Sequence, residues 1–217
     1  MRLGPLLLLA LLSIPLTAQT YRYSETTSNV TIQQSVTVTQ NESGGFVITA
    51  IDAETGDTDT MTLDNHCAAL VWVTQAKDGS TISYRRSGNS ILIEGVQHGV
   101  SVSKTVAIDG LPWYGSTDFG LGDFVRSKQT TGNFWILSPD NLKATKMSVS
   151  VIGMNTIPYI GNQIDTVKIR VTAAGVPAIF FKLLYWYRPT DGLLIHFEGA
   201  MGPPGTPQTT TQLISGE

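Results

Sequence analysis

The sequence predicts a mainly β protein, in which a single antiparallel, meandering sheet curves into a half-barrel and a short helical or loop insert covers one side. Apolar and polar residues alternate over much of the chain, as they do in strands with one face toward water. Clusters of Gly with Asn, Asp or Ser separate many of these runs and are typical of tight turns. No long helical pattern lies between the expected strands, which favours an all-β meander.

The N-terminal residues 1–18 have the features of a secretory signal peptide. Arg2 supplies a positive charge, residues 3–12 form an apolar run, and Ala18 is a small residue before the expected cleavage point. The apolar run is shorter than the roughly 20 residues that span a bilayer. We therefore expect an exported protein, periplasmic or secreted and not integral to the membrane, with residues 19–217 forming one β-rich domain.

Alternation defines the strands of this domain in order. In VTIQQSVTV, for example, Ile32, Val36 and Val38 share one face. The other expected strands are FVITAI, DTMTL, ALVWVTQ, STISYRR, SILIEGV, VSVSKTVAI, MSVSV and VKIRVT. Residues 109–132 lack the alternation and space their apolar side chains loosely at three and four, which predicts a short, glycine-weakened helix or a structured loop.

The C-terminal part begins with a β-hairpin. In YWYRPTDGLLIHF, Pro189 fits a turn and Asp191-Gly192 can supply its left-handed residue. The prolines of GAMGPPGTP remove hydrogen-bond donors, so this stretch is expected to be a Pro/Gly loop. A short edge strand, TTTQLI, is expected to follow the loop.

The composition limits the choice of partners and of stabilising groups. Charged residues make up 14% of the chain and the net charge is −3, which argues against nucleic acid because phosphates require clustered Lys and Arg. Cys67 is the only cysteine, so no internal disulfide can form and the fold depends on its core.

Two segments, AIFFKLLYWY and ALVWV, are apolar on both faces and must be covered on both. One interpretation is an apolar cavity inside the curved sheet, suited to an acyl chain or a similar ligand; the other is an ordinary packed core. The ligand-binding residues that the first interpretation selects are Trp72, Lys104, Trp113, Phe124, Trp135, Phe181 and Trp186.

Lys104 has the same parity as Val102 and Val106, which places a cation on the apolar face. It could hold an anionic headgroup at the mouth of a cavity. Alternatively, an inward charge could protect an edge strand from aggregation, or a β-bulge could reset the parity.

No catalytic, cofactor or metal motif stands out. The histidines at 66, 98 and 196 lack the short spacing of metal ligands, so we expect no metal and no cofactor. Cys67 beside His66 permits a nucleophile-base pair on paper, although a small buried residue is the simpler interpretation.

The segments LPWYG, FWILSPDNLKATKM and YWYRPTDGLLIHFEGAMGPPGTP resemble a family of uncharacterised exported bacterial β-rich proteins. That family is distantly similar to the periplasmic lipoprotein-carrier superfamily of curved antiparallel sheets. The resemblance implies an open half-barrel with a helical plug and an apolar concavity. It transfers no catalytic residue, because the carriers have none.

These observations lead to three functional hypotheses. The first is an exported soluble binding protein, not an enzyme, that holds a lipid-like or other apolar ligand in the curved sheet. The second is an interaction or structural module of the cell envelope with a protein partner and no small-molecule ligand. The third is a hydrolase that uses Cys67.

Overall fold

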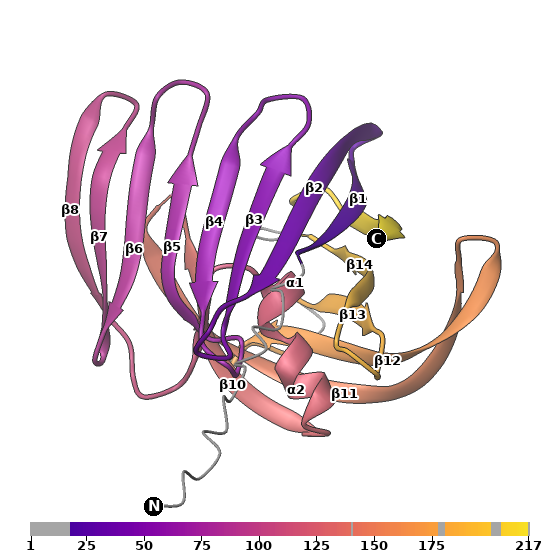
Figure 1. Ribbon diagram of the computed structural model, residues 1–217. Coiled ribbons are helices and arrows are strands. Elements are labelled where there is room, and N and C mark those ends of the chain that lie inside the picture. The colour runs from indigo at the N-terminus through magenta and orange to yellow at the C-terminus, as the bar shows by residue number, and fades with distance from the viewer. Residues whose placement is uncertain (1–17, 140, 178–180, 201–204, 217) are drawn as a thin grey trace, which may run out of the picture.

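The protein is a single curved sheet with two short helices at its centre (Figure 1). The computed structural model describes residues 18–139, 141–177, 181–200 and 205–216. The sheet has 15 strands and does not close into a barrel. The predicted fold class, a mainly β half-barrel with a short helical insert, is confirmed.

The first half of the chain is an antiparallel meander that forms one wall of the half-barrel. Each strand pairs with the next, from the middle of the sheet to one of its edges. The strands are β1 (Gln19–Thr27), β2 (Val30–Gln40), β3 (Phe46–Asp52), β4 (Thr58–Leu63), β5 (Ala69–Gln75), β6 (Thr81–Ser87), β7 (Ser90–Gln97) and β8 (Val100–Ala107).

After β8 the chain crosses to the opposite edge of the sheet. The crossing contains β9 (Trp113–Tyr114), α1 (Thr117–Gly120) and α2 (Gly122–Arg126). Both helices lie between the two walls (Figure 1). Both helices fall within residues 109–132, where the sequence predicted a helical or loop insert.

The second half forms the other wall and returns to the start of the chain. Its strands are β10 (Thr131–Ser138), β11 (Lys143–Tyr159), β12 (Asn162–Ala173), β13 (Leu183–Tyr187), β14 (Leu194–Gly199) and β15 (Thr209–Gly216). β15 pairs with β14 on one side and β1 on the other, so the prediction of an edge strand at the C-terminus was wrong. The second meander ends beside the strand on which the first began.

The two edges of the sheet are β8 and β9. β9 pairs with β10 in parallel, whereas all other strand pairs among the described residues are antiparallel. The sheet is therefore mixed, and not purely antiparallel as predicted. A parallel pair requires a crossover connection, and residues 115–130, which include α1 and α2, connect β9 to β10.

The inner face of the first wall carries a continuous row of core side chains. Direct cross-strand partners link Met61, Trp72, Tyr84 and Ile93, all of which are buried. The next member of the row is Lys104 on the edge strand β8, opposite Ile93. The parity argument therefore placed Lys104 on the correct face, and no bulge intervenes.

The predicted hairpin of residues 185–197 is present as β13 and β14. Gly192 has φ of +70°, the left-handed conformation that the turn requires. The register shifts between Trp186 and Tyr187, so Trp186 pairs with His196 but Tyr187 pairs with Leu194. Because of this bulge, Leu194 joins the buried inner face instead of alternating away from it.

Several expectations fall on residues outside the described ranges. These residues are 1–17 of the expected signal peptide, 178–180 of the doubly apolar segment and 201–204 of the Pro/Gly loop. Within the described ranges, no helix has the length and apolar character needed to cross a bilayer.

Candidate functional site

An apolar pocket of about 230 Å³ lies between the first wall and the two helices. Its apolar lining comes from strands β1 to β4, from α1 and from the β13–β14 turn. These residues are Tyr21, Val38, Phe46, Ile48, Leu63, Phe119 and Leu193. Its polar lining is Gln19, Cys67, Arg126 and Asp191. We call this space the first pocket.

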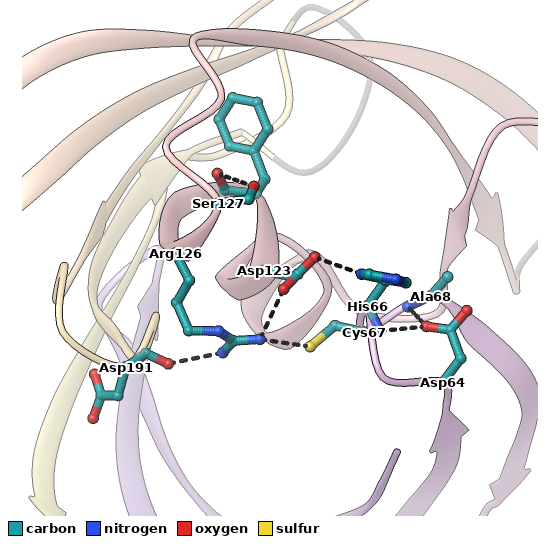
Figure 2. Close-up of polar contacts among 9 residues, drawn as sticks. Asp64, His66, Cys67, Ala68, Asp123, Arg126, Ser127 and Asp191 are labelled. Atoms are coloured by element: carbon teal, nitrogen blue, oxygen red, sulfur yellow. Dashed lines mark hydrogen bonds and ion pairs between the residues drawn. The ribbon is translucent and has the colours of Figure 1, made fainter. Parts of the chain in front are cut away.

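Arg126, the last residue of α2, donates hydrogen bonds to the β4–β5 loop and to the β13–β14 turn (Figure 2). One terminal nitrogen, Nη1, donates to the carbonyl oxygen of Asp191 at 2.9 Å. The other, Nη2, donates to Asp123 Oδ1 at 3.2 Å and to Cys67 Sγ at 3.5 Å. The guanidinium group therefore borders an apolar pocket while it is held in a fixed position.

The loop from Asp64 to Ala68 presents Cys67 and His66 to α2. Asp64 Oδ1 accepts hydrogen bonds from the backbone N–H groups of His66 and Ala68, each at 2.9 Å. Cys67 adopts φ of +61° in this turn. As a result, its sulfur points toward Arg126, and the His66 ring contacts Asp123 Oδ2 at 3.3 Å (Figure 2).

The Cys67 sulfur is in an environment that disfavours the thiolate. Burial raises the pKa of the Cys67 thiol, and the hydrogen bond from Arg126 offsets this only in part. His66 contacts Asp123 through Nδ1. Among the described residues, Arg126 is the hydrogen-bonding partner of the sulfur, and it is not a base. This geometry gives no support to a nucleophile-base pair.

α1 is anchored to both walls. Ser116 Oγ caps the helix by accepting from the Asp118 N–H at 3.2 Å. Tyr187 donates to the carbonyl oxygen of Thr117 at 2.7 Å, and the hydroxyls of Thr117 and Tyr185 lie 2.8 Å apart. Phe119 meets the Tyr23 ring edge-on, with ring centroids 6.4 Å apart.

Asp118 points into this interior without a counter-ion. Burial, together with repulsion from the nearby Glu25, raises the pKa of the Asp118 carboxyl to about 7. Among the described residues, no side-chain hydrogen bond or ion pair is made by the Asp118 carboxyl. The pKa of the Glu25 carboxyl is also raised, by its own burial and by repulsion from Asp52.

A second pocket, of about 480 Å³, lies on the other side of α2, toward β9 to β11. Its apolar lining includes Leu111, Tyr114, Leu121, Phe124, Phe134 and Val149. Its polar rim includes His66, Asp123, Gln129 and Asn133. α2 thus separates two pockets with apolar linings.

The seven predicted ligand-binding residues do not come together at one site. Phe124 lines the second pocket. Trp72 belongs to the buried inner row, where it stacks on Tyr84 at 4.7 Å and donates from Nε1 to Asp59 at 3.2 Å. Trp113 is fully buried, and its Nε1 has no hydrogen-bond partner in the described part of the chain. Phe181 is half-buried and packs against the core.

Trp135 and Trp186 lie on the outer faces of their strands. The neighbours Phe134 and Tyr185 take the inner positions. Trp135 Nε1 donates to Asp109 at 2.8 Å. Trp186 Nε1 donates to Asn155 at 2.7 Å, and the Lys168 ammonium lies 4.3 Å from the Trp186 ring centroid. Buried aromatic side chains on both faces account for the doubly apolar pattern of β13.

Lys104 lies at the open edge of the sheet, away from both pockets. Its Nζ donates to the carbonyl oxygen of Leu142 at 2.7 Å. Leu142 belongs to the turn between β10 and β11, so the contact joins the edge strand of one wall to the other wall. The charge at this edge fits the alternative interpretation of Lys104, an inward cation on an edge strand.

Sequence reasoning missed Arg126, Tyr21, Phe46 and Phe119 as pocket residues. Arg126 is two residues after Phe124 in the helical insert, where a cation beside an apolar helix was a detectable signal. The other three are ordinary apolar positions until the strands are paired. No group of three or more His, Cys, Asp or Glu side chains within the described ranges could hold a metal ion.

The fold and the pockets define an open, β-barrel-like sheet with a helical plug. No protein-family model matches the chain, and no curated protein matches its sequence. A β-barrel-like protein of domain of unknown function DUF1849 from Brucella abortus matches with a TM-score of 0.59 at 11% identity, covering 94% of this chain and 98% of that chain. The two proteins therefore share a fold.

Two further structures show weaker likeness. The hypothetical lipoprotein YmcC from Escherichia coli has a TM-score of 0.43 at 12% identity, over 91% of this chain and 86% of that chain. A Vibrio parahaemolyticus domain named for outer membrane lipoprotein sorting has a TM-score of 0.29 at 9% identity, over 92% of this chain and 84% of that chain. The predicted resemblance is confirmed as a likeness of fold by the Brucella abortus structure, which has the higher TM-score.

Proposed function

We propose that this chain is an exported, non-catalytic binding protein that holds the apolar part of an amphiphilic, lipid-like ligand in the first pocket. The observation that carries the proposal is that the apolar first pocket is bordered by polar side chains, of which Arg126 is held in place by hydrogen bonds. The expected signal peptide over residues 1–18 supports export to the periplasm or out of the cell.

The lining of the first pocket suits an alkyl chain. Side chains such as Val38, Phe46 and Ile48 offer apolar contacts and no hydrogen-bonding groups. Each methylene that leaves water for such a surface contributes about 0.8 kcal/mol. A short run of methylenes is therefore enough for measurable affinity, once the cost of immobilising the ligand is subtracted.

The rim can orient the polar end of the ligand. The Arg126 guanidinium makes three hydrogen bonds within the protein, which leaves some of its five N–H donors for a ligand oxygen. Gln19 adds an amide to the same rim. A headgroup with hydrogen-bond acceptors is therefore the expected polar end.

The test is uptake of a fluorescent fatty acid by the purified mature protein. The variant Val38→Phe fills the first pocket and should weaken uptake at least tenfold. The matched variant Val47→Phe adds the same group on the outer face of the neighbouring strand β3, where it should leave uptake unchanged. Failure of the wild-type protein to take up the probe would contradict the proposal.

A second candidate function, an envelope interaction module, is favoured by an open groove of about 650 Å³ at the sheet surface. The tip of the β11–β12 hairpin forms one side of it, and β15 forms the other. Ile160 and Ile214 line the groove and are 57% and 38% exposed. Pull-down from host envelope extract with wild type and Ile160→Asp tests this candidate, since an unchanged set of partners would remove the role of the groove.

A further inference from the structure

The two pockets beside α2 share one polar boundary. Asp123 links its halves, because its Oδ1 accepts from Arg126 at 3.2 Å while its Oδ2 contacts the His66 ring at 3.3 Å. Arg126 lines the first pocket, whereas Asp123 and His66 line the second. The boundary is therefore a polar strip that runs from one apolar pocket to the other.

The strip is accessible from outside. The side chains of His66, Arg126 and Asp123 are 74%, 32% and 24% exposed. A molecule that crosses α2 here would meet an imidazole, a carboxylate and a guanidinium, which together offer hydrogen-bond donors and acceptors. A polar linker could cross the strip without losing its hydrogen bonds, whereas an alkyl chain would cover charged groups that burial penalises.

From this arrangement we infer that the ligand is a two-tailed amphiphile, with one apolar arm in each pocket and a polar linker over the strip. The inference rests on the proposed function, because it takes the first pocket to be a binding site. It adds a second apolar subsite and a class of ligand, a diacyl lipid as distinct from a single-chain fatty acid.

The two arms should bind more tightly together than either arm alone, because they are covalently connected. Once the first arm is bound, the linker holds the second arm close to its own pocket, so its binding becomes an intramolecular step. A single-chain ligand leaves the half-buried members of the second apolar lining, Leu111 and Pro112, in contact with water. We therefore expect the two-chain ligand to bind at least tenfold more tightly than a one-chain ligand with the same headgroup.

The experiment compares a short-chain diacyl phosphatidylcholine with its lyso counterpart of the same chain length, both below their critical micelle concentrations, by calorimetry on the full mature protein. The variant Leu111→Trp fills the second pocket from the crossover, and Asn133→Phe fills it from its exposed rim in case Leu111→Trp does not fold. In either variant the affinity for the diacyl lipid should fall to that of the lyso lipid. Val47→Phe, which lies outside both pockets, should keep the wild-type ratio.

Equal affinity of the wild-type protein for the two lipids would overturn the two-tailed inference and leave the proposed function standing. A diacyl preference that both filling variants preserve would also overturn it. Binding of neither lipid would count against the inference, and the fluorescent fatty acid assay would then show whether the first pocket binds ligand at all.

Discussion

Gly122 at the start of α2 and Gly192 in the β13–β14 turn lie directly against each other. A Cβ on Gly122 would sit 2.7 Å from the Gly192 carbonyl oxygen, and a Cβ on Gly192 would meet the Gly122 carbonyl. The hydrogen bond from Arg126 to the Asp191 carbonyl crosses the same contact. Helix and turn can therefore approach closely only because both residues lack side chains.

Substitution of either glycine by alanine should displace α2. For Gly122→Ala we expect a loss of about 1–3 kcal/mol in the free energy of unfolding, as for other overpacked sites. Gly192→Ala should cost more, since its φ of +70° also disfavours a side chain. Gly110→Ala is the control, because a Cβ there meets nothing within 4 Å. If urea unfolding shows that Gly110→Ala lowers the free energy of unfolding as much as the other two variants, close contact between the glycines is not the cause.

Asp118 should make the protein less stable as the pH rises. The folded-state pKa is about 7 and the ordinary value is 3.8, so between these values the folded state keeps a proton that the unfolded state releases. The free energy of unfolding should therefore decrease from about pH 4 to about pH 7 and then level off. One pKa unit corresponds to about 1.36 kcal/mol, so the change amounts to a few kcal/mol.

Asp118→Asn should abolish most of this dependence, because an amide does not ionise. Glu25→Gln should move the decrease to lower pH, since it removes the repelling carboxylate. Urea midpoints measured across the pH range provide the test. If the urea midpoint of Asp118→Asn depends on pH in the same way as that of the wild type, another group is responsible.

Asp109, unlike Asp118, should make the protein more stable as the pH rises through the acid range. The hydrogen bond from Lys146, with those from Trp135 and the Leu111 backbone, lowers the pKa of the Asp109 carboxyl to about 2. Its stabilising contribution is therefore present above about pH 3.8 and is lost as the pH falls through about 2. Asp109→Asn should lower the urea midpoint at pH 7, while its difference from wild type should shrink near pH 2.

The double variant with Lys146→Met is the control for this contact. If the two residues stabilise the crossover through each other, the double variant should be no less stable than the weaker single variant. Fully additive losses would show that the ion pair between them is not responsible.

Lys104→Met should loosen the edge of the sheet. The variant keeps the apolar stem but loses the hydrogen bond to Leu142, which costs about 1 kcal/mol or less. Amide hydrogen exchange in β8 should become faster, whereas Lys77→Met, in an exposed turn, should leave it unchanged. Weaker binding of an anionic ligand without faster exchange would instead support the headgroup role for Lys104.

Cys67 should react slowly in the folded protein. Burial raises the pKa of its thiol, so little thiolate is present at neutral pH. We expect labelling by a thiol-reactive disulfide reagent to be at least tenfold slower in buffer than in urea, with Cys67→Ser as the blank. Rapid labelling of the folded state would revive the hydrolase hypothesis.

Much of the fold was predictable because the relevant signals are local. Alternation in VSVSKTVAI placed Lys104 on the face of Val102 and Val106, and β8 confirms this. The residues around Gly192 predicted the hairpin, and its left-handed φ confirms the turn. These features depend on residues that are neighbours in the chain, so the sequence contains the information directly.

The alternation of residues in both walls, the turns between strands and the position of the helical insert can all be read from neighbouring residues in the chain. Tertiary structure alone decided that β15 lies beside β1, that Trp135 and Trp186 point outward, and that Arg126 meets Cys67 and Asp191 at a pocket rim. The physical reason is that strand order and helix docking depend on pairings between distant residues and on close approaches such as Gly122 to Gly192. Neither leaves a periodic pattern in the chain.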